Sequence, residues 1–582
     1  MNKITLGKTN LVIEKNGFGC LPIQRIREQD AVDLLHKAYD GGINFFDTAR
    51  AYSDSEQKVG AAFSSMRDKI VLATKTGAQT AEGFRKDLET SLRTLKTDYI
   101  DIYQFHNPAF CPKPGGEDGL YDAALEAKKQ GKLVGWSSSK FPCELAEAFD
   151  LNVMYPENQA AGIAAQRDGE IMCQAAEDLG FDNDICGYAR ISLAYAAGKR
   201  ASRKFDPETL EFIIDPKSGK PLKDENGKVV IDPETGKPKK DPKTQVPYTV
   251  LDDIHEIEAL PETTEKEIAY KNFRREAIKP YKQMRIPQPD FVLCCNNICN
   301  CMTKWYENIA RMCNIPLIMV DIPYNNTVEV SDSAVKYVRA QFDNAIHELE
   351  KLTGKKFDEA KFEAACKHAN RTAQNWLKVC DYLQYKPAPM SGFDLFNHMA
   401  DVVTARGKEA AADAFELLSK DLQKNIEEGT STLPFPEQYR VMFEGIPCWP
   451  KLPNLFKPLK ENGINVTAVV YAPAFGFVYN NMDEMARAYY KAPNSVCIEQ
   501  GVAWREGICR DNKVDGVLVH YNRSCKPWSG YMAEMQRRFT ADLGVPCAGF
   551  DGDQADPRNF NEAQYATRVQ GLVEAMEANK KD

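Results

Sequence analysis

The strongest constraint in the sequence is an apolar run that opens into closely spaced cysteines. Residues 289–293 read Pro-Asp-Phe-Val-Leu, as a buried strand would, and cysteines follow at positions 294, 295, 299 and 301. In open α/β sheets, ligands bind beyond the carboxyl ends of the strands. Crowded thiols at such an end favour a soft metal or a redox group. The run therefore predicts an α/β sheet with a thiol site at its edge.

Length and composition narrow the class of protein. A chain of 582 residues should hold several domains, because single cores seldom grow past roughly 250–300 residues. The net charge of −9 argues against a nucleic-acid surface, and no apolar run approaches the ~20 residues of a membrane span. The start lacks the apolar core of a signal peptide, and 17 cysteines favour reduced, metal-binding thiols over disulfides. We expect a cytoplasmic protein of a low-oxygen cell.

The first 132 residues alternate strand-like and helix-like patterns. Such alternation is typical of βα units around a parallel sheet and predicts a partial (β/α) barrel. Strands are expected at residues 42–47, 70–75 and 99–106, and amphipathic helices at 30–39 and 83–95.

The rest of the chain reads as two doubly wound, flavodoxin-like α/β lobes with a cleft between them. The first lobe is assigned to residues 134–202 and 251–330, a helical connection to 331–440, and the second lobe to 441–582. Residues 203–250 contain a near-repeat of Pro/Gly/Lys-rich turns, which predicts an exposed hairpin insertion. Strands are expected at 291–295, 316–322, 466–471, 516–521 and 548–550, and the clearest helix at 333–352.

Four polar residues of the first segment could form a reductase site. Asp47 and Tyr52 follow one predicted strand, Lys75 ends the next, and His106 ends a third. A Lys paired with an Asp favours proton loss from a nearby phenol, and a His can orient a carbonyl. Barrel enzymes place catalysis at these carboxyl ends of strands.

This segment, with its Asp/Tyr/Lys/His set, resembles the aldo-keto reductases. The resemblance stops after about four βα units, where the family has eight, and the absent half would supply much of the nicotinamide site. We therefore do not expect NADP binding and interpret the tetrad as vestigial. An active NADP-dependent carbonyl reductase stays open as an alternative.

From about residue 134 onward the chain resembles the 2-hydroxyacyl-CoA dehydratases, and within them the alpha subunits that act on (R)-2-hydroxyglutaryl-CoA. The resemblance covers about 134–582, nearly a whole subunit. It rests on blocks at residues 135–147, 155–162, 184–190, 294–308, 443–450, 522–526 and 551–558.

The resemblance implies a [4Fe–4S] cluster held by Cys186, Cys299 and Cys525, with one iron left open for the substrate. It also implies a beta subunit that completes a heterodimer and can carry a flavin or a second cluster. A separate ATP-hydrolysing iron–sulfur activator would supply one electron. The chain has no Gly-rich loop with Lys-Ser or Lys-Thr that could bind ATP. A separate protein that binds and hydrolyses ATP agrees with this.

Expelling a hydroxyl group alpha to a thioester, with loss of a poorly acidic beta proton, is difficult for an ordinary base. One added electron turns the thioester into a ketyl radical anion that can eliminate the hydroxyl group, and the beta hydrogen then becomes far more acidic. The product from (R)-2-hydroxyglutaryl-CoA would be (E)-glutaconyl-CoA, and the electron would return at the end.

Ser139 and Glu157 match polar positions near the substrate in the family, where they would hold the hydroxyl group and move a proton. Alternatively, Ser139 caps a helix and Glu157 anchors backbone. At least one of Cys294 and Cys295 is expected to point into the core. Cys448 is expected to pack at a loop, and Cys301 to turn away from the site.

Two arginines, Arg190 and Arg523, could balance the negative charge of the cluster or of CoA. Alternatively, they are ordinary ion-paired residues. The acidic turn 551–556 is expected to cap backbone groups. A structural iron–sulfur or zinc scaffold remains a third reading of the whole chain.

Overall fold

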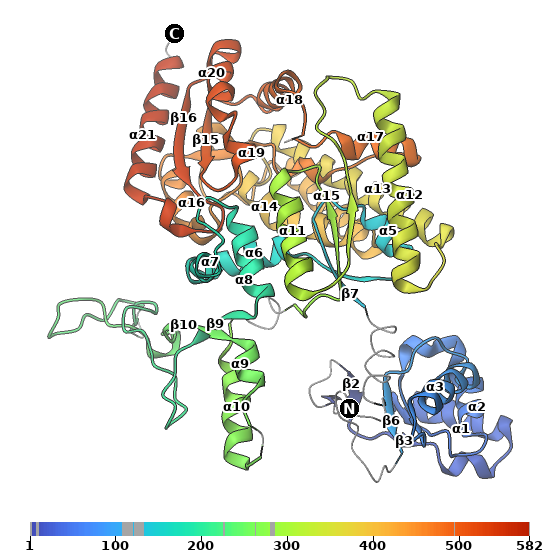
Figure 1. Ribbon diagram of the computed structural model, residues 1–582. Coiled ribbons are helices and arrows are strands. Elements are labelled where there is room, and N and C mark those ends of the chain that lie inside the picture. Colours follow the sequence, from blue (N-terminus) through green and yellow to red (C-terminus); the bar gives the residue numbers. More distant parts are fainter. Residues whose placement is uncertain are drawn as a thin grey trace. The chain divides into compact units, whose positions relative to one another are not determined.

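The computed structural model describes residues 3–6, 11–106, 120, 133–224, 227–261, 263–279, 286–493 and 495–580. The chain divides into two compact units, Met1–Leu133 and Val134–Asp582 (Figure 1). Residue 132, where the sequence predicts the first segment to end, lies outside the described residues. Within the described ranges, no helix has both the length and the apolar character needed to cross a membrane.

The first unit is built on a four-stranded parallel sheet in the order β3-β4-β5-β6. The helices that join these strands confirm the predicted βα repeat. The strands are β3 Phe18–Gly19, β4 Phe45–Asp47, β5 Val71–Thr76 and β6 Ile102–Phe105, and the helices are α1 Glu28–Asp40, α2 Ser55–Phe63 and α3 Ala81–Leu95. A short antiparallel pair, β1 Lys3–Thr5 and β2 Val12–Glu14, precedes them.

The second unit contains two four-stranded sheets, and every strand pairing within each sheet is parallel. The predicted pair of parallel α/β lobes is therefore confirmed. One sheet has the order β12-β11-β7-β8, with β7 Val134–Ser137, β8 Asn152–Met154, β11 Phe291–Cys295 and β12 Leu317–Val320. The other has the order β14-β13-β15-β16, with β13 Tyr439–Glu444, β14 Ile464–Val469, β15 Gly516–Asn522 and β16 Cys547–Gly552.

Helices accompany both sheets and connect them. Those near the first sheet are α5 Cys143–Glu147, α6 Pro156–Ala165, α7 Gly169–Asp178, α8 Gly187–Ala196 and α11 Asn300–Cys313. The connection consists of α12 Asp332–Thr353, α13 Glu359–Asp381, α14 Gly392–Ala405 and α15 Glu409–Glu428. The helices that alternate with the strands of the second sheet are α16 Leu452–Glu461, α17 Met482–Tyr490, α18 Ile498–Asp511, α19 Lys526–Ser529 and α20 Met532–Leu543, and α21 Glu562–Asn579 follows the last strand.

Helix α12 shows why its sequence pattern predicted a helix. The Ser331 hydroxyl accepts a hydrogen bond from the backbone N–H of Ala334 and caps the first turn, and Gly354 ends the helix in a left-handed conformation. The buried residues recur at three- and four-residue intervals, which makes one apolar stripe. They are Val335, Val338, Phe342, Ala345 and Leu349.

The insertion forms an antiparallel ladder. Strand β9 Lys199–Arg203 pairs with β10 Thr249–Asp253, and isolated bridges such as Ile214 to Pro247 and Ile231 to Pro238 continue the pairing between them. In the turn near residue 232, the Asp232 carboxylate accepts hydrogen bonds from the backbone N–H groups of Glu234 and Thr235. Helices α9 Ile254–Glu258 and α10 Glu265–Ala277 follow the ladder (Figure 1).

Candidate functional site

Four cysteines of the second unit line one cavity of about 70 Å³: Cys186, Cys299, Cys301 and Cys525. Three of them share a local geometry, because Cys186, Cys299 and Cys525 each occupy the position directly before a helix, at the starts of α8, α11 and α19. The N-terminus of a helix favours a thiolate, since unpaired backbone N–H groups point toward it. The three predicted ligands are therefore brought together. Cys301 does not turn away, contrary to expectation, because it lies in the first turn of α11.

Burial and mutual repulsion oppose ionisation of these thiols. Burial raises the pKa of Cys525 to about 12, and it also raises the pKa values of Cys186 and Cys299. Neighbouring thiols in the cavity raise all three pKa values further. The backbone N–H three residues further on (from Ala189, Met302 and Trp528, respectively) acts in the opposite direction. A metal that binds these side chains as thiolates would have to displace their protons.

Direct hydrogen bonds join the segments that carry Cys186 and Cys525. The backbone N–H of Gly187 donates to the Ser524 hydroxyl at 3.0 Å, and Nε2 of Gln554 donates to the sulfur of Cys186 at 3.2 Å. Gln554 lies in the turn after β16. Sequence reasoning missed it because this turn read as a capping loop, and only the fold brings it to the cysteine.

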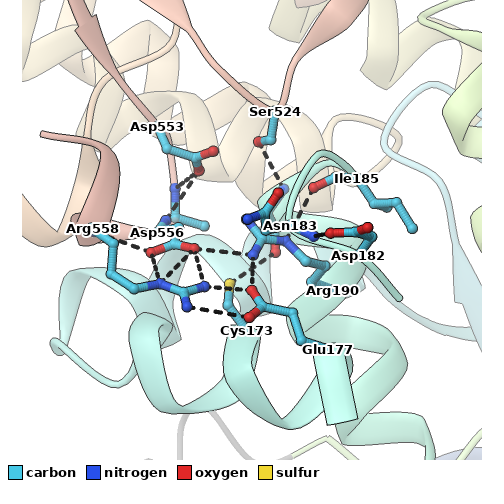
Figure 2. Close-up of polar contacts among 12 residues, drawn as sticks. Cys173, Glu177, Asp182, Asn183, Ile185, Arg190, Ser524, Asp553, Asp556 and Arg558 are labelled. Carbon is cyan, nitrogen blue, oxygen red and sulfur yellow. Dashed lines mark hydrogen bonds and ion pairs between the residues drawn. The ribbon is translucent and has the colours of Figure 1, made fainter. Parts of the chain in front are cut away.

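A buried ionic network holds the same segments together (Figure 2). The Arg190 side chain is fully buried and pairs with Glu177 at 2.8 Å and with Asp556 at 3.0 Å. Arg558 binds the same two carboxylates, at 2.5 and 2.6 Å. Arg190 is therefore an ion-paired residue that fixes α7 and α8 against the loop after β16. In that loop Asp553 accepts from the backbone N–H groups of residues 555 and 556, the capping role expected of the acidic turn.

Ser139 and Glu157 form a hydrogen-bonded pair beside the thiols. The Glu157 carboxylate accepts from the backbone N–H of Ser139 at 2.8 Å and from its hydroxyl at 2.7 Å. Ser139 follows β7 and does not cap α5, which begins after Pro142 with no side-chain cap. Burial raises the pKa of Glu157, and the two bonds from Ser139 partly offset this. A raised pKa makes the carboxyl group hold its proton more firmly, as a general acid must before it transfers the proton.

A second, larger cavity of about 450 Å³ adjoins the cysteine cavity. The two cavities share Glu157, Tyr188, Tyr471 and Phe475 in their linings. Ser139 lines the larger cavity, and Glu157 faces both. The Ser139–Glu157 pair thus lies where the larger cavity adjoins the cysteine cavity.

The remaining predicted residues have structural surroundings. Cys294 and Cys295 are fully buried in β11, and buried Cys448 lies 3.4 Å from Nε2 of His520, so the expectation of interior packing is confirmed. Arg523 is largely exposed and pairs with Asp551.

The aldo-keto tetrad is also assembled, within the first unit. Lys75 is hydrogen-bonded to Asp47 and donates to the Thr48 carbonyl oxygen at 2.8 Å. The Tyr52 ring lies edge-on to the His106 ring, with centroids 5.4 Å apart, and the Lys75 ammonium lies 5.4 Å from the Tyr52 centroid. The four side chains thus gather at the carboxyl ends of β4, β5 and β6, as the sequence predicts.

The fold and the site define an α/β protein with a cysteine-lined cavity and an added amino-terminal unit, and comparisons with known proteins identify its family. A model of the 2-hydroxyglutaryl-CoA dehydratase, D-component family matches residues 260–576. The alpha subunit of (R)-2-hydroxyglutaryl-CoA dehydratase from Acidaminococcus fermentans is 71% identical over 460 residues, which is 79% of this chain and 95% of that protein. The alpha subunit of (R)-phenyllactyl-CoA dehydratase from Clostridium sporogenes is 44% identical over 78% of this chain and 93% of that protein. The chain therefore belongs to the 2-hydroxyglutaryl-CoA dehydratase family and is a hydro-lyase subunit.

The first unit has its own relatives. A model of the aldo/keto reductase family matches residues 3–164, and an uncharacterized oxidoreductase of Bacillus subtilis is 34% identical over 149 residues. That match covers 23% of this chain and 46% of the oxidoreductase. The family match extends into residues 134–164, but β7 and β8 pair within the first sheet of the second unit.

Proposed function

We propose that the chain is the alpha subunit of a radical dehydratase that removes water from (R)-2-hydroxyglutaryl-CoA to give (E)-glutaconyl-CoA. In this proposal Cys186, Cys299 and Cys525 hold a [4Fe–4S] cluster. The observation that carries it is the cysteine cavity, in which thiols from three distant segments meet, each at the start of a helix.

The donor set fits an iron–sulfur cluster. Thiolates are the usual ligands of such clusters. The cysteine cavity is lined by four thiols, three of which lie at the starts of helices. When bound, the cluster supplies single-electron chemistry and an open coordination position for the substrate.

Ser139 and Glu157 act on the substrate hydroxyl group. A hydroxide is a poor leaving group, so the departing oxygen needs a proton, and Glu157 can deliver one because burial raises its pKa. The two hydrogen bonds from Ser139 hold the carboxyl group in place while it does so. Tyr471, Phe475 and Trp528 in the cavity wall exclude bulk water from the reacting groups.

The substrate and partners are inferred from the names of the relatives. Identity is 71% to the alpha subunit whose name specifies (R)-2-hydroxyglutaryl-CoA and 44% to the one that specifies (R)-phenyllactyl-CoA, which favours the former. An alpha subunit requires a beta subunit, which can carry a flavin or a second cluster. The electron would come from an ATP-dependent activator protein.

The proposal is tested by anaerobic co-purification of the full chain with its beta subunit, followed by assay with the activator, ATP and (R)-2-hydroxyglutaryl-CoA. We expect (E)-glutaconyl-CoA to form only when ATP is present. A complex with its full iron content and an active activator that still forms no glutaconyl-CoA would contradict the proposal.

A further inference from the structure

We propose that Lys140 forms a subsite for a carboxylate at the far end of the acyl chain, so that the cavity selects thioesters of dicarboxylic acids. The inference deepens the proposed function and rests on it for the position of the thioester.

Lys140 is a buried cation that lines the cysteine cavity beside Glu157. Lys140 is the residue after Ser139 in the sequence, and it is only 2% exposed. The ammonium donates to the Ala474 carbonyl oxygen at 2.8 Å and lies 4.9 Å and 5.1 Å from the ring centroids of Phe475 and Phe477. An ammonium has three N–H donors, so this arrangement leaves donor capacity for a ligand.

Within the described part of the chain, no carboxylate lies within ion-pairing distance of Lys140. Other buried cations of the same unit do have such partners. Arg190 pairs with Asp556, Arg505 with Glu444 and Arg440 with Glu437. Because burying an unpaired charge is unfavourable, a cation kept in a cavity wall without a counter-ion points to an anion that arrives with the ligand.

The electrostatics of the cavity support this reading. Burial, together with the nearby charge of Arg406, lowers the pKa of Lys140 to about 7, and Cys295 and Glu157 act weakly in the opposite direction. A bound carboxylate would favour the ammonium form and would itself be stabilised by it.

The chemistry of the surrounding wall favours the distal carboxylate over the thioester oxygen as the partner of Lys140. Ala474, Phe475, Ala492 and Pro493 make the wall largely apolar, which suits the methylene groups of an acyl chain. A neutral acyl chain would leave the ammonium unpaired, and sites built around a polar contact reject ligands that lack it. Lys140 is thus a specificity-determining residue.

The test uses two unreactive five-carbon thioesters, glutaryl-CoA and valeryl-CoA, which differ in the terminal carboxylate. Their dissociation constants are measured by calorimetry with the full chain in complex with its beta subunit, without ATP or activator. We expect the wild type to prefer glutaryl-CoA by about tenfold or more, as a charge-assisted hydrogen bond predicts. Lys140→Met should remove this preference by weakening glutaryl-CoA alone, and Lys140→Arg should keep most of it.

Lys491→Met is the matched control, because it removes the same charge from an exposed position outside both cavities and should leave the preference intact. A second readout guards against a misfolded Met variant. In the wild type, glutaryl-CoA affinity should fall as pH rises through the pKa of Lys140, whereas in Lys140→Arg this change should be absent. Glu157, Cys295 and Arg406 face Lys140 and are unchanged in both proteins.

The inference is overturned if Lys140→Met keeps the preference, if it weakens both thioesters equally, or if the wild type shows none. The second of these outcomes would assign Lys140 to the thioester oxygen. Because no turnover is involved, a positive binding result combined with failure of the ATP-dependent dehydration assay would count against the proposed reaction and not against the subsite.

Discussion

Both units of this chain have candidate sites at parallel sheets, but the side chains of the two sites come from differently spaced segments. Both place polar side chains beyond the carboxyl ends of parallel strands. The first unit draws Asp47, Lys75 and His106 from adjacent strands of one sheet. The second gathers its thiols from segments of both lobes, tied by hydrogen bonds and a buried ionic network.

An assembled set of side chains does not by itself establish an activity, and the two units differ in how much of their relatives they match. The aldo-keto tetrad is assembled, but the segment matches less than half of its oxidoreductase relative. The chain covers 95% of its A. fermentans relative, and the second unit carries two adjoining cavities at its candidate site. If the activity of the chain resides in the second unit alone, matched variants of the two units should behave differently.

The largest expected effect is on catalysis. Glu157→Gln should lower the dehydration rate by about 100-fold or more, because an amide cannot transfer a proton. Iron content should not change. The counterpart in the first unit, Asp47→Asn, should leave dehydration as it is in the wild type. The rates are measured with the complete complex and activator. Equal losses of rate in both variants would contradict the assignment of dehydration to the second unit alone.

The next effect concerns stability. Arg190→Met would leave buried Asp556 with Arg558 as its remaining partner, so we expect a loss of about 3 kcal/mol in the free energy of unfolding of the second unit. In the first unit, buried Glu56 accepts from Thr74 and Ser91. Glu56→Gln should therefore destabilise only the first unit. Calorimetry of both variants should show two separate transitions, and a shift of the same transition by both would contradict this.

A smaller effect depends on pH. Burial lowers the pKa of His520 to about 4, and its Nδ1–H donates to the Ile446 carbonyl oxygen at 2.6 Å. The unfolded chain therefore binds a proton at this residue below about pH 6.5, where the folded one does not. Stability present above that pH is lost as pH falls toward 4, by at most about 1.4 kcal/mol per pH unit. His520→Asn should flatten this slope in denaturant titrations of the second unit, and an unchanged slope would contradict the assignment.

The smallest effect is electronic. Gln554→Leu removes the N–H donor to the Cys186 sulfur, and hydrogen bonds to cluster sulfurs help to set the reduction potential. We expect a more negative midpoint potential with unchanged iron content, measured by redox titration. Gln536→Leu is the control, because Gln536 accepts from the Tyr521 hydroxyl and does not line the cysteine cavity.

Elements with a regular local pattern could be predicted from the sequence. Strand β11 has the predicted bounds, residues 291–295, and helix α12 differs from its predicted range by one residue at each end. Strand β13 was not foreseen as a strand, because Arg440 and Glu444 interrupt its apolar pattern. Both are buried. Glu444 pairs with Arg505 of α18, a contact between distant segments that no local pattern reveals, and Arg440 pairs with Glu437 three residues earlier.

The candidate site likewise has features that the sequence predicted and features that only the folded chain shows. The family resemblance identified Cys186, Cys299, Cys525, Ser139 and Glu157, and the structure brings them around adjoining cavities. Their roles remain predictions. Three features depend on the folded chain and were missed or wrong: the contact from Gln554, the unpaired ammonium of Lys140 and the position of Cys301.

The central claim is tested most directly by the iron and sulfide content of four cysteine variants, each purified anaerobically as the full chain. Cys186→Ser, Cys299→Ser and Cys525→Ser should each lose most of the iron and the cluster absorption. Cys301→Ser, in the same cavity but inside helix α11, should keep the wild-type content. Full iron in any of the first three variants, or an equal loss in Cys301→Ser, would contradict the assignment of the three-thiolate site.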